Sequence, residues 1–384
     1  MKKIFYIITI VVLASCSNKK IGKENYVVDT PKLLTIDQTI SNSLSDTTLF
    51  KSSTTVKLET TEESLIRQID RIAMDDGMIF IFDQSLNRIT VFGEDGTFRY
   101  NIHKTGRGPE EYIQATDFCL DPVNKKILLL CDRPYKVMYF SYEGKFEHEI
   151  STSQLDYEIC TDGKYIYTQT SSVEENSKQL TFYTEALEII NRQIEHVSTK
   201  QDGAVFSRGK TLSSNSGIYY AYQFDDNIYE LKGDSVYKKY SFDFGAYTLP
   251  RSLLEKEISF EDFSKECFEN KYICTITDIT ENDNYLIFST NIGVCVWDKR
   301  KDTFVRSHGI HDTEYNMSTG RIYTIGNSSN KVAMTCDPSI FINISRIRKT
   351  RNTGDQQSNP KFDALADQLK EDDNPILFVY EFKD

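Results

Sequence analysis

Apolar residues alternate with polar ones in short runs along most of the chain, a pattern that predicts β-strands. Residues 69–102 read IDRIAMDDGMIFIFDQSLNRITVFGEDGTFRYNI, and residues 117–150 read DFCLDPVNKKILLLCDRPYKVMYFSYEGKFEHEI. Each stretch holds four short strand-like runs separated by polar turns. Gly96 and Gly144 occupy the same place in each, where a hairpin turn requires a positive φ. Four short strands per unit are typical of one blade of a β-propeller.

Weaker copies of this unit follow along the chain. The units start at residues 69, 117, 158, 211, 276 and 322, so successive starts are 48, 41, 53, 65 and 46 residues apart. We therefore predict an all-β fold, a six-bladed β-propeller of four-stranded antiparallel blades spanning residues 32–384. The alternating segment TTVKLE at 54–59 is predicted to close the ring as the outer strand of the last blade, which contains ILFVYEF at 376–382.

Short helical insertions interrupt this pattern. SLLEKEISFEDFSKECFEN, residues 252–270, predicts one or two helices over a rim of the ring. In residues 360–375, Phe362, Leu365, Ala366 and Leu369 form one apolar stripe at helical spacing, which predicts an amphipathic helix docked on the core. Residues 346–359, RIRKTRNTGDQQSN, are basic and polar and are predicted to form a mobile connection.

The first 15 residues are typical of a signal peptide. Lys2 and Lys3 precede an apolar run that is too short to span a bilayer as a mature helix, and small residues follow it. Leu13-Ala14-Ser15-Cys16 resembles the bacterial lipobox, which implies cleavage before Cys16 and acylation of its thiol. Residues 16–31 are then a lipidated tether. The alternative is an ordinary secretory signal that has a cysteine near its end.

The net charge limits the partners that the chain could bind, and the cysteine pattern limits its possible disulfides. The formal net charge is −12, and removal of residues 1–15 takes away two lysines and no acid, so it falls to −14. A chain this acidic is not expected to bind nucleic acid by counterion release. Seven of the eight cysteines follow Cys16, and none forms a CxxC motif. Buried free thiols are favoured over a disulfide framework, although an oxidising compartment would permit one pair.

The whole chain resembles the six-bladed, NHL- or TolB-like β-propeller lipoproteins that are abundant in Bacteroidetes. The matching features are the lipobox, LETTEESLIRQIDRI at 58–72, GRGPEEY at 106–112 and DDNPILFVYEFK at 372–383. The resemblance implies an outer-membrane-anchored propeller, and for most of that family no activity has been assigned. Residues 17–20 lack the acidic run associated with surface export in these lipoproteins, which favours the periplasmic side over the cell surface.

The candidate binding residues gather in two places. KTGRGPEEY, residues 104–112, contributes Arg107, Glu110 and Tyr112. It is neither GxGxxG nor a Walker loop, and its place between two units favours an interblade corner over a ligand-cradling loop.

The second group is Asp83, Arg88 and Asp132, near strand ends in the two clearest units. The two aspartates hold equivalent positions. They either face a shared rim, as ligands to Ca²⁺ or a sugar would, or cap the turns that follow, and capping is favoured.

Catalytic motifs are absent from the sequence, which contains neither HExxH nor GxSxG. His308 and His311 flank Gly309, which favours a turn over a metal site. We therefore predict a non-enzymatic binding or scaffold protein without a cofactor, anchored by its N-terminal lipid and directed at a glycan, a peptide or an envelope protein. The alternative is a propeller hydrolase or lyase that uses Ca²⁺ held by central carboxylates, because six-bladed folds host such enzymes.

Overall fold

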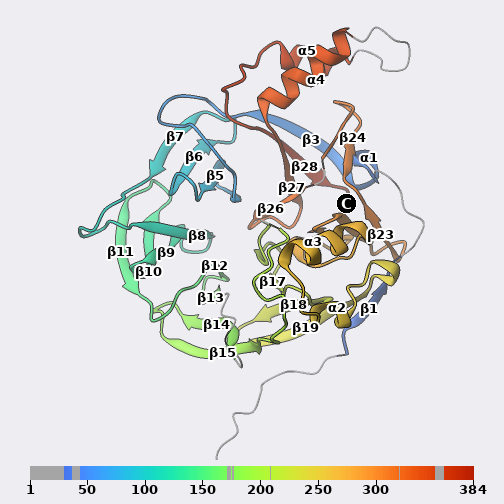
Figure 1. Ribbon diagram of the computed structural model, residues 1–384. Helices are drawn as coiled ribbons and strands as arrows, with labels where there is room; N and C mark the ends of the chain where they lie inside the picture. Colours follow the sequence, from blue (N-terminus) through green and yellow to red (C-terminus); the bar gives the residue numbers. More distant parts are fainter. Residues whose placement is uncertain are drawn as a thin grey trace, which may run out of the picture.

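A computed structural model describes residues 30–36, 44–170, 174, 177–207, 209–319, 321–350 and 359–384. The signal peptide, Cys16 and the tether up to residue 29 lie outside the described residues, as do residues 351–358. Figure 1 shows β-sheets arranged around a central axis, so that the chain forms a propeller-like ring.

The ring is built from antiparallel sheets of four strands that follow one another along the chain. The strands are β4 (Arg71–Asp75), β5 (Met78–Asp83), β6 (Arg88–Gly93) and β7 (Phe98–Ile102); β8 (Gln114–Asp121), β9 (Lys126–Arg133), β10 (Tyr135–Ser141) and β11 (Phe146–Ser151); β12 (Glu158–Thr161), β13 (Tyr165–Gln169), β14 (Lys178–Thr184) and β15 (Ile189–Glu195); β16 (Leu212–Ser214), β17 (Ile218–Ala221), β18 (Asn227–Lys232) and β19 (Ser235–Asp243); and β20 (Ile276–Glu281), β21 (Tyr285–Thr290), β22 (Gly293–Asp298) and β23 (Thr303–Ser307). The predicted four-stranded antiparallel organisation is confirmed.

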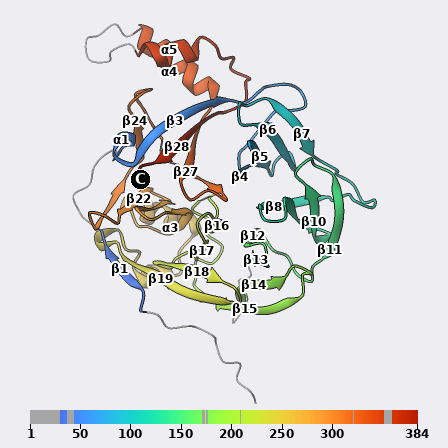
Figure 2. The same ribbon diagram turned by 180° about the vertical axis from the view of Figure 1, so that it is seen from behind.

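The chain ends share the sheet that closes the ring. Its strands are β26 (Tyr323–Gly326), β27 (Lys331–Cys336), β28 (Ile376–Phe382) and β3 (Phe50–Lys57). Val56 of β3 pairs with Leu377 of β28, which confirms the predicted outer strand, although β3 begins four residues earlier than expected. Figure 2 shows β3 running along the outside of β28 and β27. On the inner side, Ile325 of β26 pairs with Ile72 of β4, so the last sheet is bonded to the first.

Short elements extend this frame. They are β1 (Lys32–Thr35), β2 (Leu44–Ser45), α1 (Asp46–Leu49), β24 (Ile310–Asp312), β25 (Met317–Thr319), the 3₁₀ turn η1 (Gly245–Tyr247), α2 (Arg251–Leu254), α3 (Phe260–Glu269), α4 (Pro338–Thr350) and α5 (Pro360–Ala366). Strand β1 adds in parallel to the outer edge of β19. None of the helices within the described ranges has the length and apolar character needed to cross a membrane.

Hydrophobic side chains fill the space between neighbouring sheets. Phe82 of β5 lies against Phe118 of β8, with ring centroids 6.1 Å apart, and Phe242 of β19 lies 5.0 Å from Phe288 of β21. The hairpin glycines have the predicted positive φ, 86° at Gly96 and 75° at Gly144. A Cβ at Gly96 would lie only 2.1 Å from the carbonyl oxygen of Lys57. This turn therefore requires glycine for its conformation and for its contact with the end of β3.

The helices agree with the sequence except at one place. The predicted amphipathic helix is α5, and Phe362, Leu365 and Ala366 are buried against the core. The insertion at 252–270 contains α3 and most of α2. Helix α4 was not predicted, and it includes residues 346–350 of the connection expected to be mobile. Its apolar residues are interrupted by polar ones, but Phe341 is fully buried and stacks on Phe362, so tertiary packing supports the helix.

Candidate functional site

Charged side chains meet at the centre of the ring. Arg71 of β4 places Nε 2.8 Å from Oδ1 of Asp117 of β8, and Lys210 Nζ lies 3.1 Å from the same oxygen. The carboxylate of Asp117 is fully buried and also accepts a hydrogen bond from the backbone N–H of Ile159. Burial opposes the charge of Arg71, but Asp117 outweighs it and raises the pKa of the guanidinium. This cluster ties three of the innermost segments together.

Two further acids, Glu158 and Asp278, lie near this charged cluster. Glu158 of β12 accepts hydrogen bonds from the backbone N–H groups of Thr211 and Leu212 at the start of β16. Burial raises the pKa of Glu158, although Lys210 opposes the shift. Asp278 of β20 lies beside Arg321, with 3.8 Å between Oδ2 and Nε. A void of about 10 Å³, room for about one water molecule, lies beside Arg71, Lys210 and Asp278, so these side chains are closely packed.

The main cavity lies off-centre, between the sheet β12–β15 and the sheet β16–β19. Its volume is about 430 Å³. Its lining includes Tyr157, Gln169, Gln179, Tyr222, Gln223 and Arg251. A cavity of this size, with polar groups converging among aromatic rings, is typical of a small-molecule site.

Its lining combines a flat exposed ring with several planar polar groups. Tyr157 is 40 % exposed, and its backbone N–H donates to Gln169 O at 2.8 Å, so its position does not depend on its phenol. Gln223 donates from Nε2 to the carbonyl oxygen of Ala204 at 2.7 Å. Asp225, also in the lining, accepts a hydrogen bond from the Tyr229 hydroxyl at 2.7 Å. The hydrogen bonds made by Gln223 and Asp225 fix the orientation of both groups before any ligand arrives.

His196 connects two of the segments that line the cavity, one that contains Tyr222 and one that contains Asp202. His196, just after β15, contacts the Tyr222 hydroxyl through Nδ1 and places Nε2 3.0 Å from Oδ2 of Asp202. Burial disfavours the charge of Asp202, but hydrogen bonds from Thr199 and His196 outweigh it and lower the pKa of the carboxyl.

An ionised carboxylate only accepts hydrogen bonds, so Nε2 of His196 carries a hydrogen and donates it to Asp202. Burial, followed by the charge of Asp202, raises the pKa of Tyr222 to about 12, so this phenol keeps its proton at neutral pH. Both ring nitrogens are engaged within the protein. The side chain of His196 therefore fastens residues 196–202 to the end of β17.

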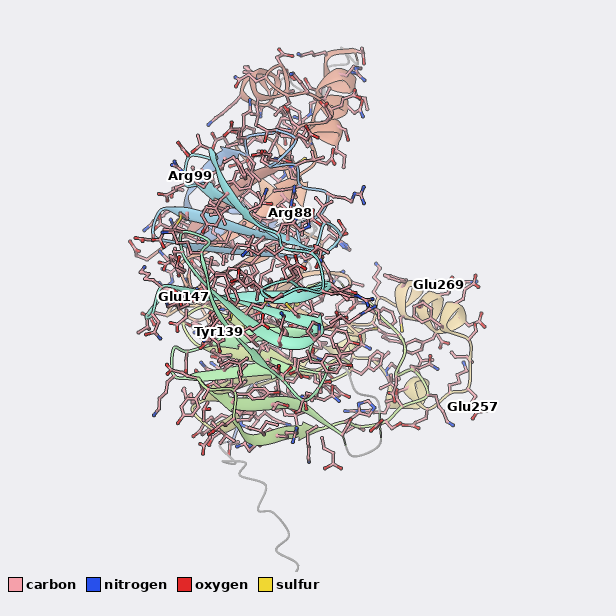
Figure 3. All side chains as sticks on the ribbon, turned by 90° about the vertical axis from the view of Figure 1, so that its left-hand side faces the viewer. Arg88, Arg99, Tyr139, Glu147, Glu257 and Glu269 are labelled. Atoms are coloured by element: carbon pink, nitrogen blue, oxygen red, sulfur yellow. The ribbon has the colours of Figure 1, made fainter. Side chains whose placement is uncertain are left out.

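The helical insertion supports this wall from behind. The carbonyl oxygen of Leu254 accepts from the N–H of Lys200, and the carbonyl oxygen of Cys274 accepts from the N–H of Phe224. The ring of Phe263 in α3 packs edge-on against Phe206 and Phe224 at 5.6 and 6.0 Å. Figure 3 shows the part of the chain that carries Glu257 and Glu269 projecting from one face of the ring. The helical insertion thus packs against the residues on one side of the cavity and stabilises them.

The residues predicted from the first unit hold the fold together. The carboxylate of Asp83 is fully buried and accepts four hydrogen bonds, from the backbone of Arg67, Gln68 and Leu86 and from the Ser85 hydroxyl. The favoured capping role of Asp83 is therefore confirmed.

The neighbouring Arg88 also has a structural contact. It donates to the carbonyl oxygen of Leu65, and burial lowers the pKa of its guanidinium, although Asp83 opposes the shift. Arg88 thus anchors the segment that precedes β4.

The segment 104–112 is a corner between β7 and β8, as predicted. The N–H of Gly106 donates to Tyr112 O at 2.9 Å, and the N–H of Tyr112 donates to Lys104 O at 3.0 Å. Tyr112 is fully buried, and its hydroxyl donates to the carbonyl oxygen of Asn87 at 2.8 Å. Glu110 is exposed and pairs with Lys104 at 2.7 Å, while Arg107 is exposed at the tip.

Asp132 differs from Asp83 despite the matching sequence pattern. It is partly buried, and its Oδ2 lies 3.5 Å from Nε of the adjacent Arg133, so it does not cap a turn as Asp83 does. None of the six predicted binding residues lines the cavity.

Over the ranges that the structure describes, no three His, Cys, Asp or Glu side chains are grouped to hold a metal ion. His308 lies beside Arg306, and His311 beside Ser318.

The sequence contained signals for the residues that were missed. Four inner strands each carry a charged residue that is followed directly by an apolar one, Arg71 in IDRI, Asp117 in DFCL, Glu158 in EICT and Asp278 in ITDI, and these four residues belong to the central cluster. Part of the cavity lining, from His196 to Thr211, belongs to the connection between β15 and β16, which is longer than a usual loop within a compact domain. Long connections of this kind are often functional.

Comparisons with known proteins agree with the fold. The solved structure of a protein from Bacteroides fragilis NCTC 9343, described as exported, matches with a TM-score of 0.73 at 16 % identity and covers 92 % of this chain and 100 % of its own. A member of the DUF4221 family from Bacteroides vulgatus matches with a TM-score of 0.47 at 10 % identity, covering 87 % of this chain and 97 % of its own. No curated protein matches the chain. Residues 31–381 match the family model described as a domain of unknown function, DUF4934, and the chain therefore belongs to the DUF4934 family.

Proposed function

We propose that this protein binds a glycan in the cavity between the sheets β12–β15 and β16–β19. The observation that carries the proposal is the cavity itself, about 430 Å³ in volume, lined by an exposed tyrosine, three glutamines and an arginine. That volume fits one or two sugar rings, within the usual range for small-ligand sites. Asp83 and Tyr112, by contrast, are buried within the fold and do not line this cavity.

The chemistry of the lining favours a sugar over an apolar ligand or a charged peptide. A sugar ring has one apolar C–H face, which stacks on a flat aromatic ring such as Tyr157, and hydroxyl groups that both donate and accept. The side-chain amides of Gln169 and Gln223 also donate and accept, so they match pairs of hydroxyls. Arg251 is exposed at the edge of the cavity, whose lining also holds the carboxylates of Glu195 and Asp225, and this mixed charge suits a neutral sugar.

The contacts of His196 stiffen the wall of this site. Both nitrogens of His196 are occupied, by Tyr222 and by Asp202, and this arrangement stiffens the cavity wall. A stiff, preorganised wall raises affinity because less conformational entropy is lost when the ligand binds.

A glycan array with two tyrosine variants tests the proposal. We expect the wild-type protein to bind at least one class of oligosaccharide, and Tyr157→Ala to weaken that binding about tenfold, since losing an aromatic platform costs on the order of 1.5 kcal/mol. Tyr135→Ala is the matched control, because Tyr135 is similarly exposed, at 43 % against 40 %, but does not line the cavity. Equal binding by the two variants, or binding only to peptides or envelope proteins, would contradict a glycan site here.

We also propose that the ring has six blades and belongs among the NHL- or TolB-like propellers of bacterial envelopes. The support is the chain of contacts between first strands, which runs from β4 through β8, β12, β16, β20 and β26 and back to β4. We place the protein outside the cytoplasm, anchored by lipid in the outer membrane on its periplasmic side. The signal-like N-terminus and the exported Bacteroides protein of similar fold support this location.

The proposed anchor predicts a specific labelling result. In cells fed radiolabelled palmitate, Cys16→Ala is expected to incorporate no label and to leave the membrane fraction, because the thiol is the acylation site and two or more acyl chains are needed for stable anchoring. Cys336→Ala serves as the control, since it also removes one cysteine but should keep the label. Label that persists in Cys16→Ala would place the anchor elsewhere.

A further inference from the structure

Two cysteines of the helical insertion lie next to each other. Cys267 is in the last turn of α3, and Cys274 precedes β20. Both side chains are almost completely buried in the same hydrophobic cluster, and each thiol lies close enough to the other to shift its pKa, that of Cys267 downward and that of Cys274 upward. The backbone between them folds back, since the N–H of Tyr272 donates to Cys267 O at 2.9 Å. Such a turn brings two cysteines seven positions apart within reach of one bond.

The remaining described cysteines are Cys119 of β8, Cys131 of β9, Cys160 of β12, Cys295 of β22 and Cys336 of β27. No second thiol shifts the pKa of Cys131, Cys295 or Cys336, and Cys160 acts on Cys119 through its charge. Cys274, like Cys131 and Cys336, donates to a backbone carbonyl oxygen, that of Tyr272 at 3.6 Å, but it also has the thiol of Cys267 beside it.

We propose that Cys267 and Cys274 form a disulfide in the mature protein, which fastens the end of α3 to the segment that leads into β20. The inference rests on the location outside the cytoplasm proposed above, because disulfides persist in oxidising compartments.

The chemistry is thiol–disulfide exchange with an oxidised dithiol oxidoreductase of the envelope. One thiolate attacks the oxidant's disulfide, and the second displaces the oxidant from the mixed disulfide. One S–S bond forms in the protein, and two electrons and two protons leave with the oxidant, which is released as a dithiol. Because both sulfurs are buried once α3 is docked, the exchange takes place as the insertion folds.

The disulfide would stabilise the segment around Phe224, which lines the cavity next to the helical insertion. The carbonyl oxygen of Cys274 accepts from the N–H of Phe224, which lines the cavity. Cys267 belongs to the same buried cluster as Phe263, and Phe263 packs on Phe224. A covalent link at this point holds α3 in place without altering any side chain that faces the ligand.

Tryptic digestion provides a direct test. Trypsin cuts after Lys265, Lys271 and Lys299, so it separates peptide 266–271, with Cys267, from peptide 272–299, with Cys274 and Cys295. From full-length protein isolated from membranes with free thiols alkylated, we expect the two peptides to appear as one species, about 2 Da lighter than their sum, that separates on reduction. Cys295→Ser should keep this species and Cys274→Ser should lose it.

A second arm distinguishes failure of the pairing from failure of the location. The same purified protein is reduced, unfolded and refolded in a buffer of reduced and oxidised glutathione, and then digested. A linked species in both samples supports the proposal. A link that forms only in the glutathione buffer would leave the pairing intact and contradict the proposed location. Separate peptides in both samples, each alkylated at its cysteine, would overturn the disulfide.

Discussion

A chain that begins at Glu62, and so lacks β3, is expected to aggregate when it is expressed. Strand β3 pairs with β28 along its whole length, from Lys57 with Ile376 to Phe50 with Phe382. Without it, β28 becomes an unpaired edge, and Phe378 and its neighbours in β28 lose their cover. An exposed apolar edge strand pairs with other chains, so the loss exceeds that of a few contacts.

A shorter truncation is the matched control. A chain that begins at Leu44 lacks β1 but keeps β3. Strand β1 adds to a sheet that already has four strands, and it buries Leu34 as its main apolar contribution. We expect this chain to be soluble and to unfold cooperatively, with a lower thermal midpoint. If the chain from Glu62 were equally soluble, with an unaltered midpoint, the ring would close without β3.

Replacement of Asp117 by asparagine is expected to cost about 3–5 kcal/mol of unfolding free energy. The carboxylate neutralises Arg71 at 2.8 Å and Lys210 at 3.1 Å. An asparagine keeps the size of the side chain but leaves two buried cations without their counter-charge, and removing one partner of a buried ion pair is far more costly than replacing the whole pair. Urea denaturation monitored by tryptophan fluorescence of Trp297 measures the change.

Glu110→Gln is the control for charge removal as such. Its pair with Lys104 is about half exposed on both sides, 48 % and 46 %, and exposed pairs contribute at most about 1 kcal/mol. We expect this variant to unfold at nearly the wild-type urea concentration. A similarly small effect for Asp117→Asn would mean that solvent reaches the central charges, contrary to the burial of Asp117 described above.

The strand framework was predictable because it depends on local patterns. The predicted units start at residues 117, 158 and 276, and the corresponding first strands begin at Gln114, Glu158 and Ile276. The period of two in TTVKLE, with Val56 and Leu58 on one face, also predicted the contact of β3 with β28, which joins residues more than 300 positions apart. A half-buried strand has this alternation wherever its partner lies.

The candidate site was not predictable in the same way. The cavity is formed by residues from several separate segments, and Tyr157, His196 and Tyr222 have no fixed spacing in the sequence that marks them as neighbours. Asp83 and Asp132 are candidates because their strand-end positions match in sequence. Yet Asp83 caps a turn and Asp132 does not, because hydrogen bonding at a strand end depends on the loop that folds over it.

The most direct test of the central claim is a crystal structure of the protein soaked with the oligosaccharide that it binds most tightly on the array. The account predicts electron density for a sugar ring stacked on Tyr157, with hydroxyl groups within hydrogen-bond distance of Gln169 or Gln223. Density for the sugar at the centre of the ring near Arg71, at the corner formed by residues 104–112, or anywhere else outside this cavity would contradict it.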